Sequence, residues 1–310
     1  MNVHADYTHN NPAQPLLRAI IRGAMRLLFR GLIRPGVPIA IQRAVIRILT
    51  AAMPVSGGVQ RSSELIADRP CEWHRIHEGS DRVILYLHGG AYLIGSTATH
   101  RGLAAALARA GQRDVCVLDY RLAPEHPFPA ARDDAVAAYK ALLTRGYAPG
   151  DIVLAGDSAG GHLALITALE LKRQGEQAPG ALVCFSPVVD FTAEQMHAPQ
   201  AGDPLLNVSW IEQAADLFCP PGMDRGHPEL SPINADLTSL PPLLIQVGED
   251  ELLLNDSLRL AEKARIAGVN VQLERYPECW HVFQANTGIL KVADIALERV
   301  GVFLGERPAA

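Results

Sequence analysis

Residues 152–161 read Ile-Val-Leu-Ala-Gly-Asp-Ser-Ala-Gly-Gly, and the interpretation of the rest of the chain depends on them. The four apolar residues predict a buried strand, and helical spacing begins directly after the last glycine. Glycines two residues to either side of Ser158 allow a sharp strand-to-helix turn, because side chains there would collide with the neighbouring strand and helix. The turn exposes the Ser158 hydroxyl and aims the first N–H groups of the helix at a reacting carbonyl. A glycine-rich turn with an incidental serine is the plainer alternative, and the flanking strand and helix favour a nucleophile.

Strands and helices alternate on both sides of this turn. Nearly continuous apolar or β-branched runs predict strong strands at 83–87, 115–118, 152–155, 182–185, 243–247 and 271–276, and weaker strands at 59–66 and 72–76. Helical spacing lies between the strong strands, at 103–110, 130–143, 161–172, 254–267 and 289–302. Apolar strands separated by helices are typical of a parallel sheet that is covered on both faces. We therefore predict an α/β fold.

The N-terminal region departs from this alternation. Residues 1–63 carry eight Arg and one Asp, whereas residues 64–310 carry 20 basic and 32 acidic side chains. The spacing predicts one helix from Pro15 to about residue 33 and a second at 39–52, separated by residues Pro-Gly-Val-Pro at 35–38. The arginine series Arg18, Arg22, Arg26, Arg30 and Arg34 is spaced by four. We interpret it as a solvated outer face, with contact to an anionic membrane as the alternative.

Residues 190–240 are the second departure, because they are long, Pro-rich and hold one helical patch near 209–218. We interpret them as an insertion over the carboxyl edge of the sheet, where such sheets bind ligands. The chain is thus divided into an N-terminal helical segment (1–55), a first part of the core (56–189), the insertion (190–240) and a second part of the core (241–310).

The composition excludes several classes of protein. The chain has 310 residues, 48% hydrophobic and 20% charged residues and a net charge of -5, which excludes wholesale disorder and gives no reason to expect nucleic acid. Its five scattered cysteines include no Cys-x-x-Cys pair and suit neither a disulfide framework nor a zinc site. The N-terminus lacks the order of a secretory signal, and no apolar run approaches the ~20 residues that span a bilayer. We therefore expect a cytoplasmic protein without a metal, and a homo-oligomer is left open.

A serine nucleophile needs a base and an orienting acid, which follow it along the chain on this type of fold. Among the histidines after Ser158, His281 is best placed, because it stands in the loop after the strand 271–276; the others are His162, His197 and His227. Three carboxylates follow the strand 243–247, namely Glu249, Asp250 and Glu251, and Asp190 is a fourth candidate. One of them would fix the tautomer of the imidazole.

An oxyanion requires backbone N–H donors close to the nucleophile. The strand 83–87 runs directly into His88-Gly89-Gly90-Ala91, where small residues let a substrate oxygen approach. We predict Gly89, Gly90 and Ala159 as the donors, and His88 as a residue that bonds loop carbonyls.

Three motifs together resemble the bacterial hormone-sensitive-lipase-like esterases, from about residue 80 to the end of the chain. They are His-Gly-Gly-Ala-Tyr at 88–92, Asp-Tyr-Arg-Leu-Ala-Pro-Glu-His-Pro-Phe-Pro-Ala at 119–130 and Gly-Asp-Ser-Ala-Gly-Gly at 156–161. The resemblance implies an α/β-hydrolase fold: a mostly parallel eight-stranded sheet with helices on both faces and a helical cap. It also implies that no cofactor is needed.

The sequence departs from that family at two places. The third glycine of the usual His-Gly-Gly-Gly motif is Ala91, which narrows the approach of the acyl group. The family commonly shows Asp-Pro-Leu about 30 residues before the histidine, and in this chain that count reaches Glu251, followed by Leu-Leu. We therefore prefer Glu251 to Asp250 as the acid.

The resemblance predicts a serine carboxylesterase that hydrolyses short-chain acyl esters through an acyl-enzyme, with Ser158, Glu251 and His281 as the catalytic residues. A lactone or small-amide hydrolase of the same fold is the nearer alternative, and a non-catalytic receptor for a small ligand is the other. Because the base must be neutral, activity is expected to rise through roughly pH 6 to 7.

Overall fold

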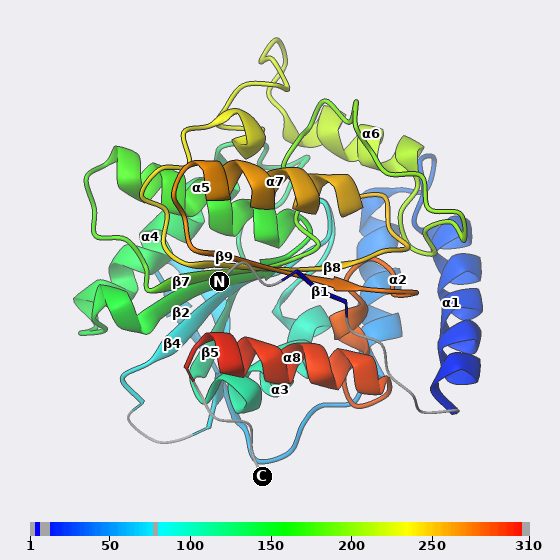
Figure 1. The fold of residues 1–310 in the computed structure, drawn as a ribbon, viewed down its shortest axis with the longest axis horizontal. Coiled ribbons are helices and arrows are strands. Elements are labelled where there is room, and N and C mark those ends of the chain that lie inside the picture. Colours follow the sequence, from blue (N-terminus) through cyan, green and yellow to red (C-terminus); the bar gives the residue numbers. More distant parts are fainter. Residues whose placement is uncertain (1–3, 7–12, 77–79, 306–310) are drawn as a thin grey trace.

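The computed structural model describes residues 4–6, 13–76 and 80–305, which build one large sheet with helices on both sides (Figure 1). The nine strands have the spatial order β1-β9-β8-β7-β6-β4-β5-β3-β2. Their bounds are β1 His4–Asp6, β2 Gln60–Ile66, β3 Arg69–Arg75, β4 Val83–Leu87, β5 Asp114–Leu118, β6 Ile152–Asp157, β7 Ala181–Phe185, β8 Leu243–Gly248 and β9 Val271–Tyr276. The eight predicted strands are present as β2–β9. The short β1 is an additional edge strand that its polar sequence does not predict.

The strands from β1 to β5 in this order pair in parallel, and β3 pairs antiparallel with both β2 and β5. The central strands β4, β5, β6, β7 and β8 are buried along their whole length. Burial on both faces explains why their sequences are continuously apolar instead of alternating. The predicted mostly parallel sheet is confirmed.

Two layers of helices cover the sheet (Figure 1). Helices α3 (Arg101–Gly111) and α8 (Lys291–Phe303) pack on one face, and α4 (Ala130–Thr144), α5 (Ala159–Arg173) and α7 (Leu254–Ile266) pack on the other. Alternate residues of each strand serve the two layers: Leu85 joins the α5 side, and Ile84 joins the α3 side. Short 3₁₀ turns lie at Thr97–His100, Pro149–Asp151, Pro232–Asn234 and Phe283–Asn286.

Three further helices lie outside these layers, at the end of the molecule to which the central strands point. They are α1 (Ala13–Leu32), α2 (Ile39–Ala51) and α6 (Val208–Phe218), and their bounds agree with the predicted helices to within two residues. Trp210 Nε1 of α6 donates a hydrogen bond to Gln42 Oε1 of α2, at 2.9 Å between buried side chains. The N-terminal segment and the insertion therefore contact each other beside the sheet.

The orientation of α1 differs from the prediction. Arg18 and Arg22 reach inward to the carboxylates of Glu278 and Asp250, and Arg26 reaches the backbone carbonyl of Ala201. The prediction of a solvated outer arginine face is therefore wrong for these three side chains. Their partners lie far along the chain, in loops whose position the local sequence of α1 does not reveal.

Candidate active site

Ser158 stands at the junction of β6 and α5, as the strand-to-helix motif predicts. Its backbone is strained, with φ 53° and ψ -119°. A side chain on Gly156 would lie 2.4 Å from the Gly160 backbone, and one on Gly160 would lie 1.9 Å from the Leu87 carbonyl oxygen. Both glycines are therefore required by close backbone packing, and they hold the serine directly before the first turn of α5.

His281 lies in the loop after β9 and contacts one carboxylate. Its Nδ1 is 3.1 Å from Glu251 Oε1, and the two residues are 3% and 0% exposed. The other Glu251 oxygen accepts hydrogen bonds from Ser186 Oγ at 2.7 Å and from the Gly248 N–H at 3.0 Å. Nδ1–H donates to the carboxylate in this arrangement, so the lone pair lies on Nε2 and is available to accept a proton.

The charge of Glu251 controls the protonation of this imidazole. Burial by itself lowers the pKa of His281, but the hydrogen bond and the charge of Glu251 outweigh it, and the pKa is raised above its ordinary value. The carboxylates of Asp203 and Asp157 add to this rise of the pKa. Asp157 directly precedes Ser158, which places His281 within electrostatic reach of the serine turn.

The other predicted carboxylates have different partners. Asp250 Oδ2 accepts a hydrogen bond from Arg22 Nη1 at 2.7 Å, and Glu249 pairs with Arg275. Asp190 accepts from Thr192 and from Arg259. The structure therefore brings Glu251, alone among the four candidates, onto the His281 ring.

In the part of the chain that it describes, the structure shows no hydrogen bond between the His281 ring and Ser158 Oγ, the proposed nucleophile. Catalytic hydrogen bonds are often long before a substrate binds, so this geometry is compatible with a serine–histidine pair. The rival His162 is engaged inside the core, where it contacts the Tyr92 hydroxyl at 2.6 Å and the Leu230 carbonyl at 2.7 Å.

The expected oxyanion donors need one correction. The Gly89 N–H already donates to Asp157 Oδ1 at 2.9 Å, and a side chain on Gly89 would overlap the Asp157 carboxylate. Gly89 thus binds Asp157 and is not free to bind a substrate oxygen. The N–H groups of Gly90, Ala91 and Ala159 donate to no other residue that the structure describes.

Ala91 is a further candidate donor, which the prediction from the sequence did not include. It lines the same cavity as Ser158 and Ala159, and its backbone is left-handed, with φ 54°. The sequence does contain a signal for this position, because the related motif has a glycine there and left-handed backbone favours glycine.

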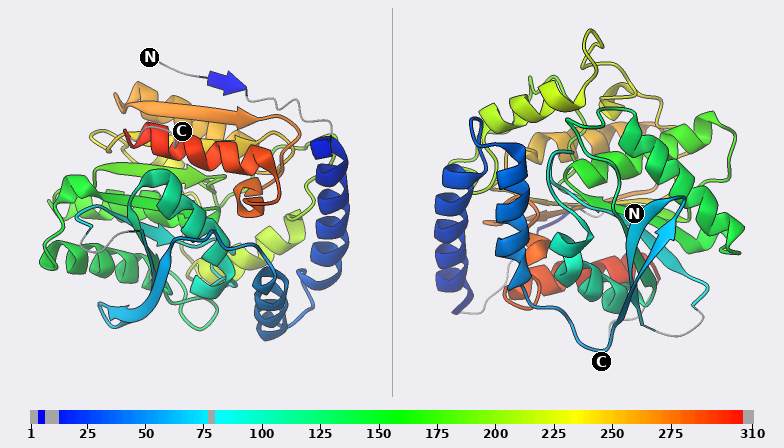
Figure 2. Two further views of the ribbon diagram at one scale, coloured as in Figure 1. Left: turned by 90° about the horizontal axis from the view of Figure 1, so that it is seen from below. Right: turned by 180° about the vertical axis from the view of Figure 1, so that it is seen from behind.

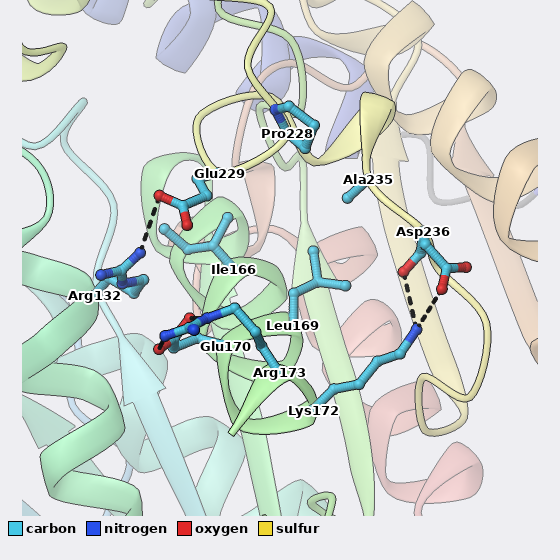
Figure 3. A pocket seen from close by; sticks show the side chains of 10 residues that line it. All are labelled: Arg132, Ile166, Leu169, Glu170, Lys172, Arg173, Pro228, Glu229, Ala235 and Asp236. Carbon is cyan, nitrogen blue, oxygen red and sulfur yellow. Dashed lines mark hydrogen bonds and ion pairs between the residues drawn. The ribbon is translucent and has the colours of Figure 1, made fainter. Parts of the chain in front are cut away.

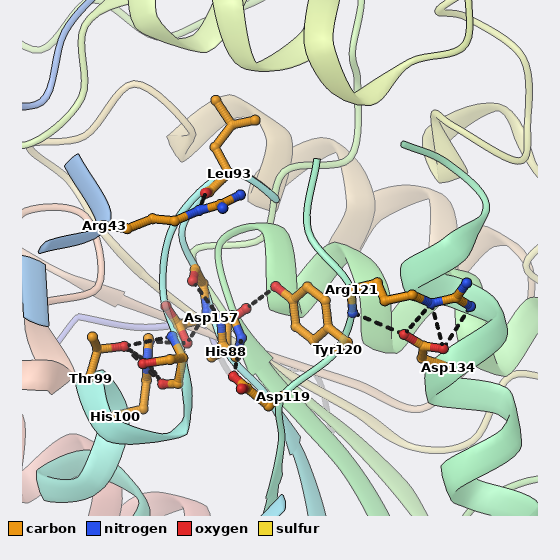
Figure 4. Close-up of polar contacts among 12 residues, drawn as sticks. Arg43, His88, Leu93, Thr99, His100, Asp119, Tyr120, Arg121, Asp134 and Asp157 are labelled. Carbon is orange, nitrogen blue, oxygen red and sulfur yellow. Dashed lines mark hydrogen bonds and ion pairs between the residues drawn. The ribbon is translucent and has the colours of Figure 1, made fainter. Parts of the chain in front are cut away.

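A buried network supports the loop that carries these N–H groups (Figure 4). Asp157 Oδ1 accepts from the Tyr86 hydroxyl at 2.7 Å and from the Gly89 N–H, and His100 Nε2 lies 3.3 Å away. Burial raises the pKa of Asp157, but the charge and hydrogen bond of His100 together with the hydrogen bond from Tyr86 outweigh it, so the pKa is lowered and the carboxylate stays ionised. The loop is therefore fixed by a charged acceptor that directly precedes the nucleophile.

His88 bonds a loop carbonyl, as predicted. Burial lowers its pKa to about 3, so the ring is neutral, and Nδ1 lies 2.9 Å from the Gly89 carbonyl. The ring stacks on Tyr120 with centroids 4.3 Å apart, and the Tyr120 hydroxyl donates to the His88 carbonyl at 2.6 Å. His88 thus shapes the loop without facing a substrate.

The cavity beside Ser158 is mostly apolar. Bulky side chains from the loop after β4, the loop after β7, the insertion and α6 form its walls: Tyr92, Val188, Phe191, Leu206, Trp210 and Ile211. Within the described residues, no group of three or more His, Cys, Asp or Glu side chains could hold a metal ion. All five cysteines are free and buried.

A second hollow lies over the far end of α5, where the insertion passes above it (Figure 3). Its floor is apolar, with Ile166 and Leu169, and its rim is charged. The rim charges pair with one another: Arg173 with Glu170 at 2.6 Å, Lys172 with Asp236 at 2.9 Å and Arg132 with Glu229 at 3.5 Å. Its lining contains neither a serine, a cysteine nor a histidine, so the cavity at Ser158 is the candidate active site.

Comparison with known proteins concerns the fold and the enzyme class of the chain. A family model described as "alpha/beta hydrolase fold" matches residues 84–285. The chain is 43% identical to an acetyl-hydrolase of Streptomyces hygroscopicus, with 75% of this chain and 78% of the relative covered, and 37% identical to an esterase of Acinetobacter venetianus, with 84% and 87% covered. It superposes on the crystal structure of an esterase from the bacterial hormone-sensitive lipase family with a TM-score of 0.86, at 38% identity and over 96% and 98% of the two chains.

Proposed function

Because the chain belongs to the α/β-hydrolase family and is a carboxylic ester hydrolase of the bacterial hormone-sensitive-lipase type, we propose that it hydrolyses short-chain acyl esters with Ser158 as nucleophile. The observation that carries the proposal is the buried contact between His281 Nδ1 and Glu251 Oε1. It fixes the tautomer in which Nε2 can remove the proton of a serine hydroxyl.

The reaction proceeds in two acyl-transfer steps. Ser158 Oγ attacks the ester carbonyl carbon while His281 Nε2 takes its proton, and the protonated ring then gives that proton to the departing alcohol. In the second step His281 deprotonates water, which attacks the acyl group on Ser158; the bond to Oγ then breaks, the proton on His281 returns to Oγ, and the acid is released. Glu251 stabilises the imidazolium that forms in both steps.

Backbone N–H groups of Gly90, Ala91 and Ala159 stabilise the negative oxygen of each tetrahedral intermediate, and Ala91 replaces Gly89 in our assignment. The three groups have no partner among the described residues, and two of these residues line the cavity beside Ser158. Removing one such donor typically costs about 10²- to 10³-fold in turnover. Asp157 positions the loop through its hydrogen bond to Gly89.

The N-terminal segment (1–55) and the insertion (190–240) form a cap over this site in our proposal. Support comes from Arg22, which binds Asp250 beside Glu251, and from α6, which contributes Trp210 to the cavity wall. The bulky walls and the methyl group of Ala91 leave room for a small acyl group. This favours short-chain esters as the substrate class.

A panel of p-nitrophenyl esters from acetate to laurate, together with lactones, tests the substrate class. We expect the highest kcat/KM at the shortest chains. A maximum at laurate, or turnover of lactones alone, would contradict the proposed substrate class without affecting the nucleophile.

Ser158→Ala tests the nucleophile, with Ser63→Ala on the exposed strand β2 as the matched control. We expect Ser158→Ala to lose about 10⁴-fold or more of its ester hydrolysis and Ser63→Ala to retain all of it. A fluorophosphonate should add one phosphonyl group to the peptide that contains Ser158, as measured by mass spectrometry. Labelling of another residue, or full activity of Ser158→Ala, would disprove the assignment.

A further inference from the structure

The outward side of α1 is apolar between residues 15 and 27, where the arginines of the helix reach toward the protein. Between residues 15 and 27, every exposed residue of the helix is Pro, Leu, Ala, Ile or Gly. Leu16, Ile20 and Leu27 are 68%, 59% and 77% exposed, and they follow one another along a single stripe at helical spacing. A surface helix usually turns one apolar stripe to the core, and α1 does so with Leu17, Ile21 and Met25; the exposed stripe is a second one, on the solvent side.

Helix α2 continues the pattern beside α1 (Figure 2). Its exposed residues are Ala or Ile apart from Arg47. Seven of the eleven exposed large hydrophobic side chains of the described residues belong to α1, α2 and the segment that follows: Leu16, Ile20, Leu27, Leu32, Ile41, Ile48 and Val55. We call the exposed residues within 15–55 the outer helical surface. Such a concentration of apolar side chains marks an interaction site.

The charge of the outer helical surface is positive only. Its exposed charged residues are Arg30, Arg34 and Arg47, and the sequence contains no acidic residue between positions 7 and 63. A second copy of the chain docked by twofold symmetry would bring this surface against itself and place like charges together. An anionic lipid surface complements both features, because it accepts apolar side chains and attracts arginine.

We propose that the outer helical surface docks on anionic lipid membranes. Leu16, Ile20 and Leu27 enter the boundary between headgroups and acyl chains, while the exposed arginines contact lipid phosphates. No helix in the described part of the chain is long and apolar enough to cross a membrane, so the contact is an interfacial one. It is separate from Arg18 and Arg22, which remain bound to Glu278 and Asp250 on the inward side.

Vesicle sedimentation with the full chain tests the proposal. The probes are phosphatidylcholine vesicles and vesicles that also contain about 30% phosphatidylglycerol. We expect roughly tenfold or stronger partitioning onto the anionic vesicles, weakened by high salt. The triple variant Leu16→Ser, Ile20→Ser, Leu27→Ser should lose at least about tenfold of this binding, because it removes three buried apolar side chains from the contact.

A matched control changes three exposed hydrophobic residues elsewhere, Leu65→Ser, Ile266→Ser and Val302→Ser, and should bind as the unchanged protein does. Hydrolysis of a soluble ester by both triple variants checks that they are folded. A third triple variant, Arg30→Gln, Arg34→Gln, Arg47→Gln, tests the arginines. If it binds both kinds of vesicle equally, the arginines account for the preference for anionic lipid.

Three results would overturn the proposal. The first is that the unchanged protein fails to bind anionic vesicles, and the second is that the control triple loses as much binding as the α1 triple. The third is a dimer in analytical ultracentrifugation that the α1 triple dissociates, because the outer helical surface would then be covered by a second copy.

Discussion

Strand β6 and helix α1 show how differently a sequence specifies the two sides of an element. All six residues of β6 are buried, so both faces of the strand meet the core. An apolar run is enough to predict such a strand, because it does not matter which face is turned inward. Helix α1 has one side with arginines and another with leucines, and either could face the protein. The structure turns the arginines inward, because distant loops supply the partners of Arg18 and Arg22. Periodicity thus predicts that the helix exists but not which side it buries.

The largest expected effect separates the two carboxylates of the loop after β8. Glu251→Gln should lower kcat by about 10³- to 10⁴-fold, because the imidazole loses the acceptor that sets its tautomer. Asp250→Asn should change kcat by less than about tenfold, because that carboxylate binds Arg22 of α1 and not the ring. Initial rates with p-nitrophenyl acetate measure both. Comparable losses in the two variants would mean that the loop, and not Glu251 alone, orients His281.

The second prediction compares stability in the two regions directly. Leu154→Ala in β6 should lower the free energy of unfolding by about 2–5 kcal/mol. The Leu154 side chain is fully buried, so the change leaves a cavity in the core. Leu27→Ala on α1 should change it by less than about 0.5 kcal/mol, since that side chain is already in water. Urea unfolding measures both values. A loss above about 1 kcal/mol for Leu27→Ala would show that its side chain is packed in solution.

The third prediction concerns the pH dependence of hydrolysis. His281 acts as the base only when neutral, and Glu251 raises its pKa above the ordinary value of 6.5. The kcat/KM of the unchanged protein should therefore rise about tenfold per pH unit up to a midpoint above pH 6.5 and then level off. The residual activity of Glu251→Gln should show a lower midpoint, because burial remains while the charge is removed. A rate that is constant from pH 5 to 8 would contradict a histidine base.

The sequence predicts those parts of the molecule that short-range patterns determine. Continuous apolar runs locate the strands, and the spacing of Gly156 and Gly160 locates the nucleophile turn because both glycines meet neighbouring backbone. The errors concern contacts between distant residues. The Gly89 N–H is bound by Asp157, 68 positions later, and no feature near Gly89 reveals that bond.

The choice among carboxylates shows the same limit. Glu249, Asp250 and Glu251 stand in one loop, and their order alone does not reveal which of them turns toward His281. The resemblance to a family favours Glu251 through a count of residues. In the structure the other two are held by Arg275 and Arg22, so the selection depends on β9 and on α1. The sequence of the loop alone does not reveal either partner.

The smallest predicted effect tests whether these arginines hold α1 in place. Arg22 donates to Asp250 Oδ2 at 2.7 Å and to the Gly202 carbonyl at 3.1 Å, and about one fifth of each side chain in the ion pair is exposed. Arg22→Gln should lower the free energy of unfolding by about 1 kcal/mol, less than a fully buried pair would lose, because solvent screens the charges. Arg30→Gln, on the exposed end of the same helix, is the matched control and should change it by less than about 0.5 kcal/mol.

A double-mutant cycle of Arg22→Gln with Asp250→Asn isolates the ion pair from other effects of each change. A coupling of about 0.5–1 kcal/mol is expected from a partly exposed pair that is also hydrogen-bonded. A coupling of zero would mean that the inward arginines do not fix the rotation of α1. The exposure of Leu16, Ile20 and Leu27 would then have to come from the packing of Leu17, Ile21 and Met25 on the other side of the helix.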